Sequence, residues 1–412
     1  MNFVYISPNF PAVMQNFCAA LHGNGVNVLG IGDAPYDALS DMLKAALTEY
    51  YRVDSLERYD DVLRAVGYFT FKYGKIDWLE SNNEYWLAQD ARLRTDFNIT
   101  TGLKTPELDP YKYKSCMKAV FQKAGIPAAR WQLTAALEDA LRFAAEVGYP
   151  IIIKPDNGVG ASDTRKIADE NALRAFFAAP GPARYIMEEY VPGEVTTYDG
   201  LCNSRGEVLF AASHITPSSI MDMVNNADDC FYYVNQPAAK DVCRAGQAVL
   251  AALGAKSRCF HLEFFRLTED KPGLGKRGSL AALEINMRPA GGFTPDMLNY
   301  AYSASLYQMY ADMVVYDGLR HTYDGPRTFC AYFGRRDGKR YQHTHSEIIA
   351  QYGPQLRMAG RMPDALSDAM GNQVYIACFP TKRELNACAD FILSPPKAAG
   401  RKKARKSAAH SE

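Results

Sequence analysis

The first hundred residues alternate apolar runs with helical patterns, and this alternation constrains the fold more than any other feature of the chain. Residues 2–6 and 26–31 are short, nearly continuous apolar runs, and residues 13–23 between them carry apolar side chains at helical spacing. Helical patterns recur at 57–73 and 83–97. Strands separated by helices predict an open parallel sheet. No GxGxxG follows the first strand, so the sequence does not support a dinucleotide site there.

Length and charge exclude several classes of protein. The 412 residues exceed one ordinary core and predict two to three domains, and 48% hydrophobic with 22% charged residues is typical of a globular protein. The formal net charge is zero, which predicts no strong attraction to nucleic acid or to an anionic membrane. Residues 396–412 carry six lysines and arginines against one glutamate, a composition that predicts a disordered basic tail.

Cysteine usage and hydropathy bear on location. The nine cysteines include no CxxC pair and lie mostly among apolar residues, as reduced core cysteines do. The N-terminal residues lack the basic start and long apolar run of a signal peptide, and no apolar stretch approaches membrane-spanning length. We therefore expect a cytoplasmic protein with no membrane partner.

The run LAALEINMRPAGG places three polar side chains two residues apart. If the run is a strand, Glu284, Asn286 and Arg288 share one face, while Ile285 and Met287 point to the core. Mg²⁺ prefers hard oxygen ligands, and a guanidinium suits a phosphate or a developing acyl phosphate. An amphipathic edge strand would show the same alternation, so this run alone leaves both interpretations open.

Two further stretches offer phosphate-binding and hinge chemistry. In IIIKPDNGVGAS an apolar run leads into Lys154 and a glycine-bearing loop, whose backbone N–H groups can approach phosphate oxygens. The loop lacks the GK[ST] of a Walker A motif, and a glycine-rich turn would look similar. In YIMEEYVPGEVTTYDG, acidic residues flank an apolar run that could connect two lobes and meet a purine edge and a ribose. An exposed hairpin is the alternative.

Taken together, and in their order along the chain, the three stretches resemble the ATP-grasp superfamily. The resemblance covers most of the chain, up to about residue 312. The AGIP run at 124–127 is typical of the helix end that follows a phosphate lysine by eleven residues, which places that lysine at Lys114. The family's usual aspartate before it is Tyr113 here, a departure from the pattern. The resemblance implies an α/β fold, in which a Rossmann-like pre-ATP-grasp domain precedes a two-lobed α+β ATP-grasp domain.

The resemblance also implies domain boundaries and site residues. A pre-ATP-grasp domain is expected at 1–104 and an ATP-grasp domain at 105–312. The ATP-grasp domain has a small lobe at about 115–190 and a large lobe at about 191–312. A segment at 313–394 is expected to complete the large lobe, and the tail follows at 395–412. The expected nucleotide-binding residues are Lys114, Lys154, Gly158, Gly160, Glu188, Glu189, Tyr190, Val191 and, at the ribose, Glu194.

Three residues match the metal ligands of the family, and one arginine lies beside them. Glu263, Glu284 and Asn286 are expected to bind Mg²⁺, with Mn²⁺ as an alternative ion, against the phosphates of ATP. Arg288 is expected to stabilise an acyl phosphate and the oxyanion that follows it, and Lys154 to brace the phosphates. Arg288 and Lys154 are thus the expected catalytic residues.

The continuation RPAGG resembles carboxylate–amine ligases of the amino-acid and dipeptide ligase type. It implies an ADP-forming ligase that couples a small carboxylic acid to an amine, in a protein that could also form a homo-oligomer. A biotin carboxylase or carbamoyl-phosphate-type enzyme acting on bicarbonate is one alternative, although the QVEH-like run of the biotin enzymes is missing. A non-catalytic ATP-binding module is another, although a binding module has no need of the full metal set.

Several residues nearby keep two interpretations. Glu84 either approaches the substrate or caps the helix that begins at Asn82 or Asn83. His214 and His261 lie in strand-like segments, where His261 shares a face with Glu263 and either orients substrate or is a hydrogen-bonded core histidine. The acidic run 225–230, with two tyrosines after it, is expected to be a solvated loop, or a mobile loop that touches an amine.

Overall fold

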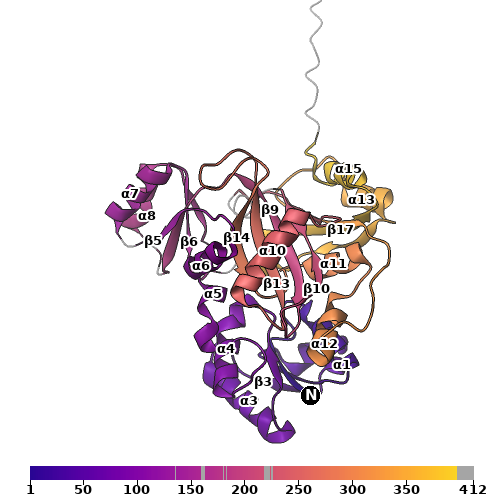
Figure 1. Ribbon diagram of the computed structural model, residues 1–412. Coiled ribbons are helices and arrows are strands. Elements are labelled where there is room, and N and C mark those ends of the chain that lie inside the picture. Colours follow the sequence, from indigo (N-terminus) through magenta and orange to yellow (C-terminus); the bar gives the residue numbers. More distant parts are fainter. Residues whose placement is uncertain are drawn as a thin grey trace, which may run out of the picture.

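The computed structural model describes residues 1–396, apart from Ala135, residues 159–162, Pro180, Pro182, residues 218–222 and residues 224–225. The glycine loop around Gly160, the start of the acidic run and the basic tail therefore lie outside the described residues. Within the described chain, helices and sheets are mixed as expected (Figure 1), and no helix is long and apolar enough to cross a membrane.

The N-terminal part is an open parallel sheet of strand order β3-β2-β1-β4. Its strands are β1 (Asn2–Ile6), β2 (Asn27–Gly32), β3 (Glu49–Arg52) and β4 (Trp78–Glu80), and its helices are α1 (Met14–Gly23), α2 (Asp41–Ala46), α3 (Tyr59–Tyr73) and α4 (Leu87–Asp96). The parallel sheet expected for the first hundred residues is therefore present. Val4 and Leu29 pack against Phe69 of α3, so α3 covers one face of the sheet.

A smaller antiparallel sheet of order β5-β8-β6-β7 follows. It comprises β5 (Trp131–Leu133), β6 (Ile151–Pro155), β7 (Arg165–Ile167) and β8 (Tyr185–Glu189), is reached through α5 (Asp109–Lys112) and α6 (Lys114–Ala124), and carries α7 (Leu137–Val147) and α8 (Glu170–Ala178). Phe143 and Phe176 of these two helices pack on Ile151 and Ile153. The opposite face of the sheet, which carries Lys154 and Glu188, is turned toward α6 and the large sheet.

The third sheet runs in the order β14-β13-β9-β11-β12-β15-β17-β16, with β10 paired to β9. Its strands are β9 (Gly193–Cys202), β10 (Val208–Ala212), β11 (His214–Thr216), β12 (Cys230–Val234), β13 (Arg258–Leu267), β14 (Leu280–Asn286), β15 (Phe329–Arg335), β16 (Leu356–Arg361) and β17 (Gln373–Phe379). Its helices are α10 (Lys240–Leu253), α11 (Thr294–Tyr302), α12 (Leu306–Tyr316), α13 (His345–Tyr352), α14 (Asp364–Met370) and α15 (Lys382–Leu393). We call it the large sheet.

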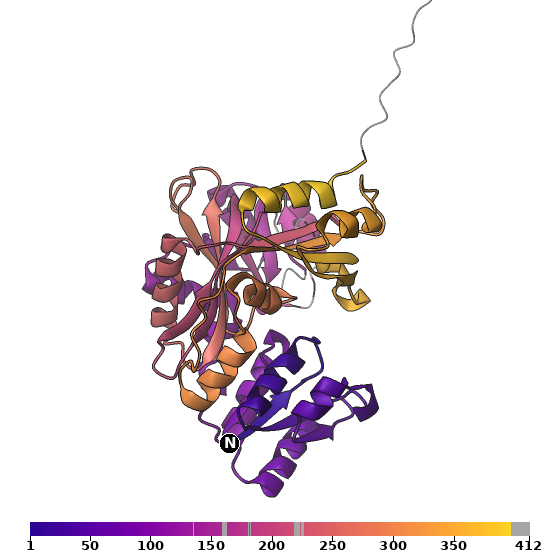
Figure 2. The same cartoon turned by 90° about the vertical axis from the view of Figure 1, so that its right-hand side faces the viewer.

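Aromatic packing joins the N-terminal sheet to the large sheet. In Figure 2, α12 lies between the two, and the rings of its Tyr307 and Tyr310 meet Phe17 of α1 edge-on, with centroids 4.8 and 5.3 Å apart. Tyr310 also meets Phe3 of β1. One apolar core therefore runs from the N-terminal sheet through α12 into the large sheet.

The expectation of a loop at Tyr232 and Tyr233 is wrong. Both tyrosines belong to β12, which pairs with β11 on one side and β15 on the other, and both are buried. The preceding acidic residues, Asp228 and Asp229, do lie outside the strand and pair with Lys339. The strand is hard to recognise in the sequence, because its apolar residues follow the acidic run directly and begin only at Cys230.

Candidate functional site

Two adjacent strands of the large sheet bring the three expected metal ligands together. Glu263 of β13 is paired directly with Glu284 of β14, and His261 with Asn286. Ile285 and Met287 are buried on the opposite face, as the alternation predicts. Carboxylates directly opposite each other on neighbouring strands repel, so their pairing is costly unless a cation lies between them.

The donor set fits a hard divalent cation. The three side chains offer carboxylate and amide oxygens, the ligand type that Mg²⁺ prefers. Burial and the nearby charge of Glu263 raise the pKa of Glu284, although Lys114 acts against this shift. Glu284 Oε1 lies 2.7 Å from Lys114 Nζ, yet it has no partner in hydrogen-bond geometry among the described residues. A bound cation would supply the missing interaction.

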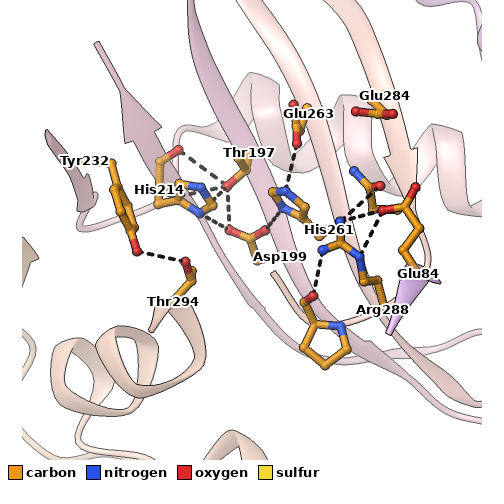
Figure 3. Close-up of polar contacts among 12 residues, drawn as sticks. Glu84, Thr197, Asp199, His214, Tyr232, His261, Glu263, Glu284, Arg288 and Thr294 are labelled. Carbon is orange, nitrogen blue, oxygen red and sulfur yellow. Dashed lines mark hydrogen bonds and ion pairs between the residues drawn. The ribbon is translucent and has the colours of Figure 1, made fainter. Parts of the chain in front are cut away.

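Arg288 sits beside this set and is held by a residue of the N-terminal part. Its Nη2 and Nε donate to Glu84 Oε2 at 2.6 and 3.1 Å, and its Nη2 is 3.4 Å from Asn286 Oδ1 (Figure 3). Asn83, not Glu84, caps the short turn Glu84–Trp86, since its Oδ1 accepts from Tyr85 N. Glu84 therefore faces the site, and the helix-cap interpretation does not hold.

A buried cluster of lysines and glutamates lies where the small sheet meets α6. Lys154 Nζ is 2.7 Å from Glu188 Oε2, Lys118 Nζ contacts Glu188 Oε1, and Lys114 pairs with Glu284. Burial alone would raise the pKa of Glu188, but the two lysines lower it to about 2. Three cations against two anions leave one positive charge in a largely buried place, which is an arrangement suited to an anion.

Sequence reasoning missed Lys118 and Asp156 in this cluster. Lys118 is four residues after Lys114 and so lies on the same face of α6, a signal that was available in the sequence. Asp156 is fully buried and accepts from Ser115 N and Ser115 Oγ, both at 2.8 Å. It thus supplies, from the end of β6, a carboxylate at the start of α6, next to the position where Tyr113 departs from the family pattern.

The expected hinge residues have different surroundings. Glu189 is buried and binds Arg130 through both carboxylate oxygens, and Val191 packs in a small apolar cluster with Leu267. Lys166 Nζ lies 4.5 Å from the ring centre of Tyr190, and Glu194 is exposed at the start of β9. Their backbone joins the small sheet to the large sheet, between β8 and β9.

Gly158 is close to the lysine cluster. Its carbonyl oxygen accepts a hydrogen bond from Lys114 Nζ at 2.8 Å, and a Cβ at this position would come 2.9 Å from Pro155. The backbone of the loop therefore begins against the expected phosphate lysine. Gly160 falls outside the described residues.

The two histidines belong to one hydrogen-bonded cluster with Asp199 of β9. His261 Nδ1 is 2.7 Å from Asp199 Oδ1 and its Nε2 is 2.9 Å from Glu263 Oε1, while His214 Nδ1 is 2.8 Å from Asp199 Oδ2 (Figure 3). Burial alone would lower the pKa of His261, but the two carboxylates raise it to about 9. Asp199 was not expected, because its role depends on the strand order β13-β9-β11.

Comparisons with known proteins agree with this geometry. A family model described as the carbamoyl-phosphate synthase L chain, ATP binding domain, matches residues 113–183. The L-arginine-specific L-amino acid ligase of Bacillus subtilis is 25% identical over 267 residues, which cover 62% of this chain and 62% of that protein. The carbamoyl phosphate synthase large chain of Hyperthermus butylicus is 23% identical over 61% of this chain and 23% of that protein. The match thus spans less than two thirds of either relative.

Solved structures extend the likeness over nearly the whole chain. The L-amino acid ligase from Bacillus licheniformis superposes with a TM-score of 0.70 at 14% identity, covering 95% of this chain and 97% of that one. The N5-carboxyaminoimidazole synthetase from Staphylococcus aureus in complex with ADP gives a TM-score of 0.68 at 16% identity, covering 95% and 96%. The expected α/β fold is confirmed, and the chain shares this fold with these ATP-grasp structural neighbours.

Proposed function

We propose that the protein is an ATP-dependent ligase that couples a small carboxylic acid to an amine and releases ADP and phosphate. We propose an amino acid as the amine. The observation that carries the proposal is the joint position of Glu263, Glu284 and Asn286 beside Arg288, next to the buried lysine cluster. This arrangement brings a metal site, an anion site and a guanidinium together. The likeness to L-amino acid ligases supports the same chemistry.

Lysines, carboxylates and Arg288 have separate roles in this proposal. Lys114, Lys118 and Lys154 hold the phosphates of ATP. Glu263, Glu284 and Asn286 would hold Mg²⁺, which would supply positive charge against the phosphates. Arg288 orients the substrate carboxylate and then stabilises the oxyanion formed when the amine attacks. We also propose that the hinge residues bind the nucleotide, with Glu194 at the ribose.

Four further expectations stay predictions. They are the domain boundaries, a cytoplasmic location, Mn²⁺ as a substitute for Mg²⁺, and a homo-oligomer.

Glu84 has a part in the same proposal. Its carboxylate occupies Arg288 when no substrate is bound, so an incoming carboxylate competes for the guanidinium. The small cavity here is lined by residues from the N-terminal part, from α5 and from the end of β14 and the residues after it, including Asn83, Leu87, Tyr111 and Met287. The N-terminal part therefore contributes to the acid-binding side of the site.

The test is ATP consumption with Mg²⁺ across pairs of amino acids, other small acids and amines, with ADP, AMP and phosphate measured separately. We expect ADP and phosphate to appear only when one acid and one amine are both present. ADP release with bicarbonate alone would instead indicate a carbamoyl-phosphate-type enzyme, the class of the matching family model. Tight ATP binding without turnover on any pair would indicate a binding module.

Lys154→Ala tests the phosphate role in the same assay. Removing Lys154 deletes one of the cations around Glu188 and should weaken ATP use, seen as a raised KM for ATP. Lys276→Ala is the matched control, because Lys276 is an exposed lysine whose ion-pair partner, Asp270, is not part of the cluster. An unchanged KM in Lys154→Ala would contradict the assigned role.

A further inference from the structure

A polar row crosses the large sheet beyond the metal and arginine residues. Paired positions carry it from Asn286 on β14 to His261 on β13 and Asp199 on β9, and His214 of β11 continues it. The rings of His214 and His261 are nearly parallel, with centroids 5.5 Å apart. Figure 3 shows this row leading from Arg288 past Asp199 to His214 and Tyr232. Neither nucleotide nor metal binding, as proposed above, uses its far end.

The two histidines differ in the nitrogen atoms that remain available. His261 has both nitrogens against carboxylates, Asp199 and Glu263, so it is a doubly protonated donor that has no free lone pair. His214 uses only Nδ1, toward Asp199 Oδ2 at 2.8 Å and Thr197 Oγ1 at 3.0 Å. Among the described residues, nothing hydrogen-bonds to its Nε2.

Asp199 and Thr197 fix the tautomer of His214. Asp199 Oδ2 accepts the Nδ1 proton, which leaves the lone pair on Nε2. Thr197 Oγ1 donates to the same carboxylate oxygen and accepts from the backbone N–H of His214 at 3.0 Å. Both Nδ1 atoms lie against Asp199, at 2.7 and 2.8 Å, so they donate to its carboxylate and have no lone pair for a metal ion. The cluster is therefore a hydrogen-bonded relay. The relay aims a proton-accepting nitrogen away from Asp199.

We propose that His214 is the catalytic base that takes a proton from the incoming amine, with Asp199 as its positioning residue. This inference rests on the proposed ligase function and names the acceptor side of the same site. An amino acid arrives as an ammonium ion, which has no lone pair for attack. His214 Nε2 accepts one ammonium proton, and the freed lone pair then attacks the acyl carbon.

Bond formation and release of phosphate need no further reactant. The new C–N bond forms in a tetrahedral adduct, whose oxyanion then collapses as the C–O bond to phosphate breaks and the phosphate leaves with that electron pair. The second nitrogen proton passes to the departing phosphate or to water. His214 stays ready for another cycle once its proton reaches solvent. The groups that face His214 are Asp199, His261 and Tyr232, whose ring centre lies 5.6 Å from that of His214.

The test compares two amines with one acid in wild type and His214→Asn. Hydroxylamine is largely neutral at pH 7 and traps an acyl phosphate as a hydroxamate without a base, whereas an amino acid needs one. We expect His214→Asn to lose about 100-fold or more in amide formation, while hydroxamate formation stays close to wild type. The loss should shrink as the pH rises above the pKa of the amine, because the substrate then deprotonates itself.

Further variants separate this role from a structural one. His214→Gln and Asp199→Asn should show the same split, with the smaller loss in Asp199→Asn, since that variant keeps the base. His345→Asn is the control: His345 is exposed and bonds Tyr375 Oη in another part of the sheet, so both reactions should be unchanged. Equal losses with both amines, or no loss with either, would overturn the assignment of His214. Absence of any acid-dependent hydroxamate in wild type would overturn the ligase function itself.

Discussion

At the residue scale, Arg288 illustrates how the site draws on distant parts of the chain. Its partner Glu84 lies 204 residues away, and both side chains are largely buried at the junction of the N-terminal part and β14. The alternation in the sequence predicted that Arg288 lies beside Asn286, although β14 ends at Asn286 and Arg288 follows it. The contact with Glu84 could not be derived, because it depends on how the N-terminal sheet docks against the large sheet.

Arg288→Ala should lower kcat by about 100-fold or more, because a preorganised donor to the oxyanion is lost. ATP binding should change little, since the lysine cluster is intact. Steady-state kinetics and nucleotide titration check the two effects separately. Arg327→Ala is the control, because this exposed arginine lies over the ring of Tyr302, away from the row. A wild-type kcat in Arg288→Ala would contradict the mechanism.

The burial of Asp90 predicts that the free energy of unfolding depends on pH. It is fully buried, and burial together with the charge of Glu80 raises the pKa of Asp90 to about 7. The unfolded chain releases this proton near pH 4, at about the ordinary value. As the pH rises between these two values, the folded state alone retains the proton, so the free energy of unfolding falls.

Asp90→Asn should remove this part of the pH dependence while keeping acceptors for Ser81 N and Ser81 Oγ. Denaturant unfolding at a series of pH values from about 4 to about 7 measures it. The slope of unfolding free energy against pH should be flatter in the variant. Parallel slopes in the two proteins would show that Asp90 does not titrate in this window.

At the scale of elements, the turn between β14 and α11 combines two glycines in unlike environments. Gly292 has φ +61, and a Cβ there would come 2.7 Å from Met370 Cε and 3.6 Å from Tyr232 Oη. A Cβ on Gly291 would meet no atom within 4 Å. The turn is thus tight at one glycine and open at the other, and it starts α11 beside the polar row.

Gly292→Ala should destabilise the fold by about 1–3 kcal/mol, because alanine in the left-handed region is strained and its methyl group crowds Met370. Gly291→Ala is the matched control, with little expected change in thermal stability. Equal melting temperatures for the two variants would contradict the strain at Gly292.

The elements also show what the sequence can and cannot reveal. Continuous apolar runs identified β1, β2 and β6, and Gly125 at a left-handed φ ends α6 as expected. The paired ligands on β14 followed from simple alternation. The relay of Asp199 and His214 could not be found, because strands distant in sequence become neighbours only in the folded sheet. His214 does lie in a strand, as expected, but it opens the short strand β11, which is separate from β10.

At the scale of the whole molecule, a buried carboxylate ties the N-terminal sheet to the large sheet. Glu80 Oε2 of β4 is 2.7 Å from Arg94 Nη2 of α4 and 2.9 Å from Arg258 Nη2 of β13. All three side chains are almost fully enclosed. Together with the aromatic contacts of α12, this bridge positions Glu84 against Arg288, so the site depends on the docking of the two sheets.

Glu80→Ala should lower the free energy of unfolding by about 3 kcal/mol or more, because two buried guanidinium groups lose their shared carboxylate. Denaturant unfolding measures the loss. Asp337→Ala should have no measurable effect, since the ion pair of Asp337 with Arg361 is exposed. An equally small change in Glu80→Ala would mean that water or rearranged neighbours satisfy the two arginines.

Formation of an acyl phosphate can be followed by the transfer of oxygen from the acid to phosphate. The acid that supports ADP release is labelled with ¹⁸O in its carboxylate, and the phosphate is analysed by mass spectrometry after turnover with ATP, Mg²⁺ and the amine. Phosphorylation of the carboxylate predicts one labelled oxygen in each phosphate released. Phosphate free of label would contradict the acyl-phosphate mechanism and, with it, the proposed roles of Arg288 and His214.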